Sequence, residues 1–101
     1  MSYRIVFKEE AYNDVLETRL WYESRQKGLG NRFLDEIEEH LKIIEREPRL
    51  FQTRKNNWRY CPLRKFPYLI VYEIEQEDLI VYAVFNSFQS PLRLKKRQEE
   101  K

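Results

Sequence analysis

Basic residues in the middle of the chain are the first candidates for chemistry. Residues 48–72 carry six Lys or Arg side chains and no Asp or Glu, which gives this segment a charge of +6. Lys and Arg bind phosphate groups through charge-assisted hydrogen bonds and stabilise negative charge that develops on them. The segment therefore indicates contact with a phosphate-bearing target such as a nucleic acid. The candidates for this contact are Arg54, Lys55, Arg59, Arg64 and Lys65.

Groups that could exchange a proton with a substrate are scarce. Cleavage of RNA without a metal ion needs one group that takes the 2′-hydroxyl proton and another that protonates the leaving oxygen. The single histidine, His40, lies near the apolar side of a predicted helix, where a packing role is the more usual one. The acidic residues of the same helix have the spacing of a solvated face: Asp35, Glu36, Glu38 and Glu39. We therefore predict no metal site and no cofactor.

The length and composition predict one domain without disulfides. The chain has 101 residues, 42% of them hydrophobic, enough for one compact core and too few for two ordinary domains. We expect this domain to cover residues 1–95 and residues 96–101 to form a charged C-terminal tail that could be disordered. No apolar segment approaches the length of a membrane span, and the first residues lack the pattern of a secretory signal. With its single cysteine, the chain is expected in the cytoplasm.

The formal net charge of +2 hides strong differences between segments. Residues 9–47 carry eleven acids against six bases, for a charge of −5, and residues 73–92 carry four acids and no base. Together with the basic segment 48–72 this pattern predicts a surface with an acidic and a basic pole, of which the basic one could meet a polyanion. The alternative is a set of solvated faces that bind no specific partner.

Two helices are predicted in the first half of the chain, after a short strand at residues 3–7. The first, at residues 9–26, has one apolar row that includes Ala11 and Val15 and a second row formed by Tyr12, Leu16 and Leu20. Two rows predict a helix that is packed on two sides, against a sheet and either a neighbouring helix or a partner protein. Gly28 and Gly30 are the only glycines and suit a left-handed helix cap. A second helix should follow from the N-cap Asn31 until Pro48 stops it.

The second half of the chain has the pattern of β-strands. Branched and aromatic residues dominate residues 58–63, 66–74 and 79–85, and a short acidic link before residue 79 predicts a hairpin. The predicted order is therefore β-α-α-β-β-β. It describes an α+β fold in which a helical hairpin packs on a small, twisted and mostly antiparallel sheet.

The ordered motifs along the chain resemble the RelE/ParE superfamily, the toxins of type II toxin–antitoxin systems that are also called plasmid stabilisation proteins. The resemblance covers nearly the whole chain. It depends on the following residues: Ala11, Asp14 and Val15; Trp21-Tyr22-Glu23; Gly28-Leu29-Gly30 with Phe33; Pro48 with Phe51; Arg59; Lys65-Phe66-Pro67-Tyr68 with Ile70 and Tyr72; and Ala83-Val84-Phe85.

The resemblance implies a toxin that a cognate antitoxin holds inactive. RelE-like members cleave mRNA on the ribosome, and ParE-like members poison DNA gyrase, so the expected targets are the ribosome with its mRNA or gyrase. The resemblance also leaves open whether the chain forms a homodimer. In many relatives the last strand ends with a histidine, followed by an arginine, a proline and an aromatic residue. Here Asn86, Gln89, Pro91 and Leu94 occupy these places.

These replacements leave the enzymatic activity open, because neither Asn nor Gln exchanges a proton near neutral pH. If the chain is a metal-independent endoribonuclease, we expect Arg59, Asn86 and Arg93 to be catalytic, with Tyr82 as a further substitute although its strand position favours the core. Gln89, Lys95 and Lys96 should join the basic residues in binding the target. Two further hypotheses remain: a degenerate, non-toxic family member, and a basic nucleic-acid-binding module with interleaved aromatic residues.

Overall fold

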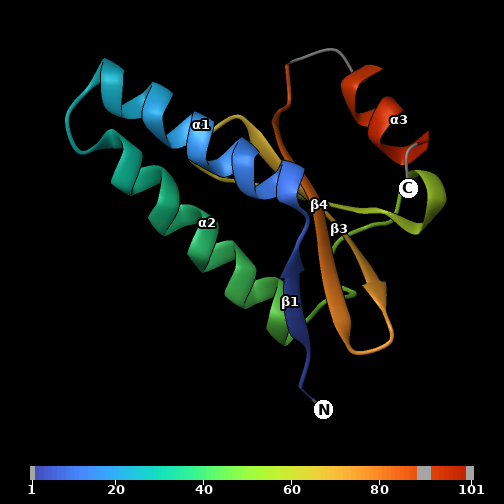
Figure 1. Ribbon diagram of the computed structural model, residues 1–101. Helices are drawn as coiled ribbons and strands as arrows, with labels where there is room; N and C mark the ends of the chain where they lie inside the picture. The colour runs from blue at the N-terminus through green and yellow to red at the C-terminus, as the bar shows by residue number, and fades with distance from the viewer. Residues whose placement is uncertain (1, 89–91, 100–101) are drawn as a thin grey trace.

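The computed structural model describes residues 2–88 and 92–99 and contains four strands and three helices in this part of the chain (Figure 1). Their bounds are β1 Arg4–Phe7, α1 Glu9–Arg25, α2 Leu29–Arg46, β2 Arg59–Pro62, β3 Tyr68–Glu75, β4 Asp78–Asn86 and α3 Leu92–Glu99, with a 3-10 turn at Lys55–Asn57. The predicted α+β fold and the order of its first six elements are confirmed. The sequence analysis missed α3.

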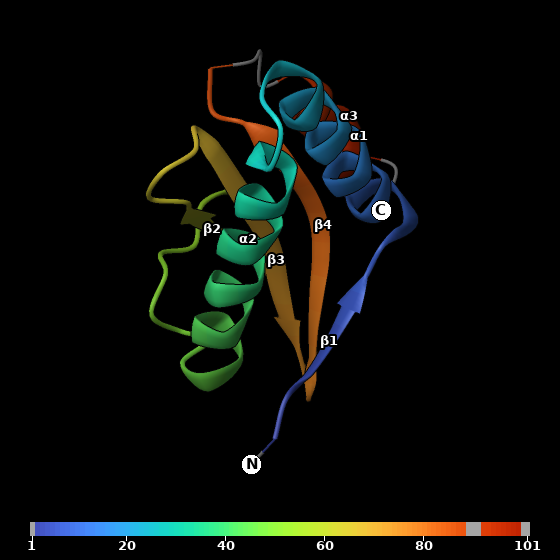
Figure 2. The ribbon, with the colours of Figure 1, turned by 90° about the vertical axis from the view of Figure 1, so that its left-hand side faces the viewer.

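The strands form one sheet in the order β1-β4-β3-β2. β1 lies parallel to β4, and the other two pairs are antiparallel, as the prediction of a mostly antiparallel sheet requires. α1 and α2 cover one face of this sheet, called the inner face here, while α3 lies beyond β4 on the side away from α2 (Figures 1 and 2). Residue 96, where we expected a tail to begin, lies within α3; the division into a domain and a tail stays a prediction.

The two long helices meet closely at their connection. Gly28 has a φ of 87°, a left-handed conformation that glycine adopts without a steric penalty, and it is the residue before α2. The predicted N-cap at Asn31 is wrong, because the turn at Gly28 already starts the helix at Leu29. A Cβ atom on Gly30 would lie 2.8 Å from the carbonyl oxygen of Arg19 in α1. Glycine at this position therefore lets the two helices approach.

The main core lies between the helical hairpin and the inner face. Phe33, Ile37 and Ile44 of α2 are buried there. Burial of side chains of this size stabilises the fold by about 1.5–3 kcal/mol each. They pack with Ala11 and Val15 of α1 and with sheet residues that include Ile70, Tyr72, Leu79, Val81 and Val84. His40 is also buried, and its Nδ1 lies 2.8 Å from the carbonyl oxygen of Glu36, which agrees with its predicted packing role.

A smaller core lies on the outer face of the sheet. β3 and β4 pair with a bulge, since Val71 is opposite Ala83 whereas Tyr72 is opposite Val81. The extra residue, Tyr82, therefore shares the outer face with its neighbour Ala83. Its ring stacks on buried Trp58 at a centroid distance of 4.2 Å. Tyr82 is only 7% exposed, as the core interpretation of this residue expected.

None of the helices in the described part of the chain is long and apolar enough to cross a membrane.

Candidate target-facing surface

The predicted basic residues form two groups at different places on the sheet. Arg54 lies in the segment before β2, where its guanidinium carbon is 4.6 Å from the ring centre of Tyr60. A cation over an aromatic ring is held by the quadrupole of the ring, and Arg54 remains exposed. Lys55 follows in the 3-10 turn and Arg59 begins β2, whereas Arg64 and Lys65 lie in the loop between β2 and β3.

Arg59 stabilises the loop between α2 and β2. Its Nη1 donates to the carbonyl oxygen of Phe51 at 2.6 Å and lies 3.4 Å from that of Arg49. Loop carbonyls need donors because they have no partner in a helix or sheet. The described contacts of Arg59, predicted to be catalytic, are therefore structural ones.

A small pocket of about 200 Å³ opens beside this loop. It is lined by Arg49, Thr53, Asn57, Arg59, Glu73 and Ile74. Glu73 accepts a hydrogen bond of 2.9 Å from the hydroxyl of Tyr82, so a carboxylate, a phenol and two arginines lie near one another. The sequence analysis did not select Glu73. The signal that could have found it is its place two residues after Val71, on the same face of β3, where an acid directly follows a run of apolar residues and is half-buried in the structure.

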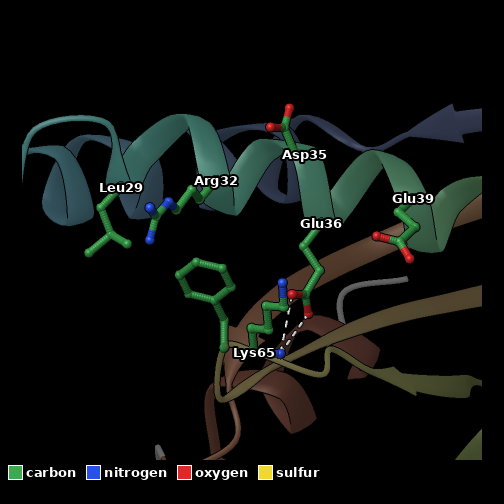
Figure 3. A pocket seen from close by; sticks show the side chains of 7 residues that line it. Leu29, Arg32, Asp35, Glu36, Glu39 and Lys65 are labelled. Atoms are coloured by element: carbon green, nitrogen blue, oxygen red, sulfur yellow. Dashed lines mark hydrogen bonds between the residues drawn. The ribbon is translucent and has the colours of Figure 1, made fainter.

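Arg64 and Lys65 lie next to α2 because Glu36 holds their backbone. Glu36 is only 5% exposed, and its carboxylate accepts from the N–H group of Arg64 at 2.5 Å. It also accepts from the N–H group of Lys65 at 2.9 Å (Figure 3). The prediction of a solvated acidic face is therefore wrong at Glu36. The Arg64 side chain pairs with Glu39 at 2.7 Å. Lys65 lines an open groove of about 620 Å³, whose other lining residues are Leu29, Arg32, Asp35, Glu36, Glu39 and Phe66.

Asn86 ends β4 far from Arg59. Asn86 is opposite Tyr68 and Arg59 is opposite Tyr72, four residues away along β3, which corresponds to about 13 Å of strand. The side-chain oxygen of Asn86 accepts a hydrogen bond of 2.8 Å from the N–H of Phe88 and so shapes the turn after the strand. Gln89 lies outside the described residues. Arg93, Lys95 and Lys96 belong to α3, where Lys96 is exposed.

The C-terminal helix is tied to α1 and β4 by an ion pair that the sequence analysis missed. β1 pairs with β4 only as far as Val81, so among the described residues no strand pairs with the later half of β4 on that side. Asp14 accepts from the N–H of Val84 at 3.0 Å, and Arg97 donates to Asp14 at 2.6 and 2.9 Å. The two side chains are 12% and 19% exposed. They are 83 residues apart in sequence, and only the fold makes this pairing visible.

The buried ionisable groups of the sheet are poor catalysts at neutral pH. Burial raises the pKa of the Cys61 thiol to about 12, so the thiolate that would act as a nucleophile is not formed. Burial also raises the pKa of Tyr72 to about 12, and its hydroxyl donates to the carbonyl oxygen of Pro48 at 2.6 Å. Within residues 2–88 and 92–99, no group of three His, Cys, Asp or Glu side chains is placed to hold a metal ion.

The structure is that of a small α+β protein, with a four-stranded sheet, a helical hairpin on one face and two groups of basic residues in the segments that flank β2. Residues 5–90 match the family model described as ParE toxin of type II toxin-antitoxin system, parDE. The chain belongs to this family, within the RelE/ParE superfamily, and is a toxin of a type II toxin–antitoxin system. No curated protein matches the sequence significantly.

Solved structures show the same fold. The chain is similar to a protein of the chromosomal ParDE TA system from P. aeruginosa, with a TM-score of 0.74, 11% identity, and coverage of 83% of this chain and 95% of that one. It is also similar to a mutant of the E. coli toxin RelE in the free state, with a TM-score of 0.64, 16% identity and 98% coverage of both chains. At these identities the similarity concerns the fold alone.

Proposed function

We propose that this toxin inhibits DNA gyrase by binding it, and that a cognate antitoxin keeps the toxin inactive. One observation carries the choice of mechanism. The described residues that were expected to be catalytic, Arg59 and Asn86, lie about 13 Å apart along the sheet and each stabilises a loop or turn. A surface that binds a large enzyme complex needs no acid and base beside a phosphate, so this arrangement suits inhibition by binding.

The target-facing surface of this proposal centres on the segment before β2 and on α3. Arg54 offers an exposed cation held over the ring of Tyr60, and Lys96 adds a charge from α3. Arg is frequent at binding hot spots because its planar fork and its stacking fix several contacts at once. The action would take place in the cytoplasm, where the target lies. A homodimer is not required by this proposal.

The test is to induce the toxin alone in bacteria and to examine DNA and mRNA together. We expect growth arrest with trapped gyrase–DNA breaks and intact transcripts. An Arg54→Glu variant should lose most of the toxicity, whereas Lys42→Glu, the same charge change at an exposed site of α2, should keep it. Cleaved mRNA with ordinary gyrase activity would contradict the proposal, and the absence of any arrest would favour the degenerate, non-toxic form.

The pocket beside β2 favours a second candidate, ribosome-dependent cleavage of mRNA. In this candidate Glu73 takes the 2′-hydroxyl proton as the 2′ oxygen attacks the phosphorus, and it then gives this proton to the leaving 5′ oxygen. Arg49 and Arg59 hold the phosphate, and Tyr82 orients the carboxylate. If this candidate is correct, mRNA 5′ ends should accumulate on induction and should disappear with Glu73→Gln. Persistent cleavage by this variant would exclude the pocket as the catalytic site.

The antitoxin is tested separately, by expressing the toxin with the product of the adjacent reading frame. The two chains should purify as one complex, and co-expression should restore growth. The loss of toxicity without a complex would contradict the proposed partner.

A further inference from the structure

α3 is a short helix whose described side chains are all polar. It has eight residues, and helices of this length are not stable in water without tertiary contacts. The structure describes the side chains of residues 96–99, of which Lys96 and Glu99 are exposed and Arg97 and Gln98 are half-buried. The place of α3 in the fold should therefore depend strongly on a polar anchor.

The ion pair of Arg97 with Asp14 provides this anchor. Nη1 and Nη2 of Arg97 donate to the two carboxylate oxygens at 2.6 and 2.9 Å, and the side chains of Arg97 and Asp14 are only 19% and 12% exposed. Salt screens a pair at this depth much less than it screens a surface pair. Two parallel N–H···O bonds also fix the direction of the guanidinium as well as its distance. Asp14 therefore determines where Arg97, and with it α3, lies.

The same pair satisfies the backbone of β4 just after its pairing with β1 ends. The Asp14 carboxylate accepts from the N–H of Val84 at 3.0 Å, and Nη1 of Arg97 donates to the carbonyl oxygen of Tyr82 at 3.3 Å. In a wider sheet, the C=O and N–H groups of a neighbouring strand would fill these two places. The edge thus requires an acceptor at Val84 and a donor at Tyr82. Asp14 supplies the first and Arg97 the second, which ties α3 to one point of β4.

Tyr82 connects this anchor to the other part of the target-facing surface. Its ring stacks on Trp58 at a centroid distance of 4.2 Å, and the carbonyl oxygen of Trp58 accepts from the N–H of Arg54 at 2.7 Å. A continuous series of contacts therefore leads from α3 through Tyr82 and Trp58 to Arg54. The two parts of the surface, Arg54 before β2 and Lys96 in α3, share this buried support.

We propose that Asp14 is a positioning residue for target binding: through Arg97 it holds α3 on β4 and so keeps Lys96 at a fixed place relative to Arg54. The carboxylate is mostly buried and acts without touching the target. The inference rests on the proposed function for the identity of the target. If α3 were in place only about a tenth of the time, the apparent affinity would fall about tenfold, because the binding-competent form would be that much rarer.

The test compares Asp14→Asn with Asp35→Asn. Both changes remove one carboxylate charge with almost no change in size, but Asp35 is an exposed residue of α2. Amide hydrogen exchange in α3 reports whether the helix is in place, and inhibition of purified gyrase reports target binding. For Asp14→Asn we expect exchange in α3 to be about tenfold faster or more, and half-inhibition to need about tenfold more toxin. Asp35→Asn should change neither value.

Further variants separate positioning from loss of the fold. Arg97→Lys keeps the cation but loses the two-point bond, so its inhibition should lie between those of the original chain and Arg97→Gln. Ile37→Val weakens the main core without touching the pair and should inhibit gyrase normally while circular dichroism shows it folded. If Asp14→Asn does not fold, Arg97→Gln replaces it, because this change leaves the carboxylate bound to Val84. Normal inhibition by a variant whose α3 exchanges fast would overturn the proposal, and so would weaker inhibition with α3 unchanged.

Hydrogen exchange needs no target, so this proposal and the proposed function can fail separately. If the original chain arrests growth without inhibiting gyrase, the proposed function fails, and the dose that arrests growth replaces the gyrase assay. A dose that rises with Asp14→Asn but not with Asp35→Asn would then support the positioning role, and a dose that rises with neither would overturn it. If the original chain inhibits gyrase and Asp14→Asn inhibits it equally well with α3 released, the function stands and the positioning role fails.

Discussion

The two helices of the hairpin have nearly equal lengths, 17 and 18 residues, but they use their apolar residues differently. α2 buries Phe33, Ile37 and Ile44 on one side and turns its other side to solvent. α1 buries only Ala11 and Val15 and leaves a second apolar row exposed. The apolar residues of α2 are therefore explained by packing within the fold. Those of α1 are not, because its second row is exposed, as apolar residues at binding surfaces are. The following predictions test this division of roles.

The largest effect is expected in the core of α2. Phe33 is fully buried and lies 5.3 Å from Phe66 between ring centres, so Phe33→Ala leaves a cavity. Such a change costs about 3–5 kcal/mol. Urea unfolding followed by circular dichroism should show this loss. Leu16→Ala in α1 is the control and should change stability by less than about 1 kcal/mol, since Leu16 is partly exposed. Similar losses for the two variants would contradict the division of roles.

The polar side of α1 should give the second largest effect. Asp14→Ala leaves the guanidinium of Arg97 and the N–H of Val84 without their carboxylate. Removal of one partner of a mostly buried ion pair costs about 3 kcal/mol. In a double-mutant cycle with Arg97→Ala the two losses should not add, because either change breaks the same pair. Additive losses would show that the pair does not hold α3 to α1.

Gly30 tests the contact between the two helices. A Cβ at this position would meet the Arg19 carbonyl oxygen at 2.8 Å and a Glu23 side-chain oxygen at 2.9 Å. Gly30→Ala should therefore cost about 1–3 kcal/mol by overpacking, although alanine is the better helix former. Gly28→Ala provides a contrast, because space is open there and only its left-handed backbone is strained. A stabilised Gly30→Ala variant would contradict the close helix approach.

Glu23 of α1 should make the contact between α1 and the start of α2 dependent on pH. Hydrogen bonds from Gly28 and Gly30 lower its pKa below the ordinary 4.5, so it stabilises the folded state above about pH 4.5 and loses this effect as the pH falls through the lower folded value. Glu23→Gln should therefore flatten the acid side of the stability profile and leave its slope near neutral pH unchanged. If the stability of the variant falls at low pH as steeply as that of the original chain, the pKa of Glu23 is not lowered by folding.

Sequence patterns predicted α1, α2, the strands and the two apolar rows of α1, because these features depend on local periodicity, but they did not predict α3. They did not predict that Glu36 is buried, since its neighbours have the spacing of a solvated face and its partners Arg64 and Lys65 come from a distant loop. The Asp14–Arg97 pair was missed for the same reason. Arg59 shows the converse: its residue type suggests phosphate binding, but its described contacts are to loop carbonyls.

The exposed row should give the smallest effect on stability. Leu20 is 67% exposed, so Leu20→Ser removes little apolar surface from the folded protein and should change the free energy of unfolding by no more than about 0.5 kcal/mol. Urea unfolding measures this value, and Val15→Ser, at a buried position of the same helix, should lose several times more. A large loss at Leu20 would mean that the row stabilises the free toxin. A small loss would show that the row contributes little to the stability of the free toxin, as the exposure of Leu20 indicates.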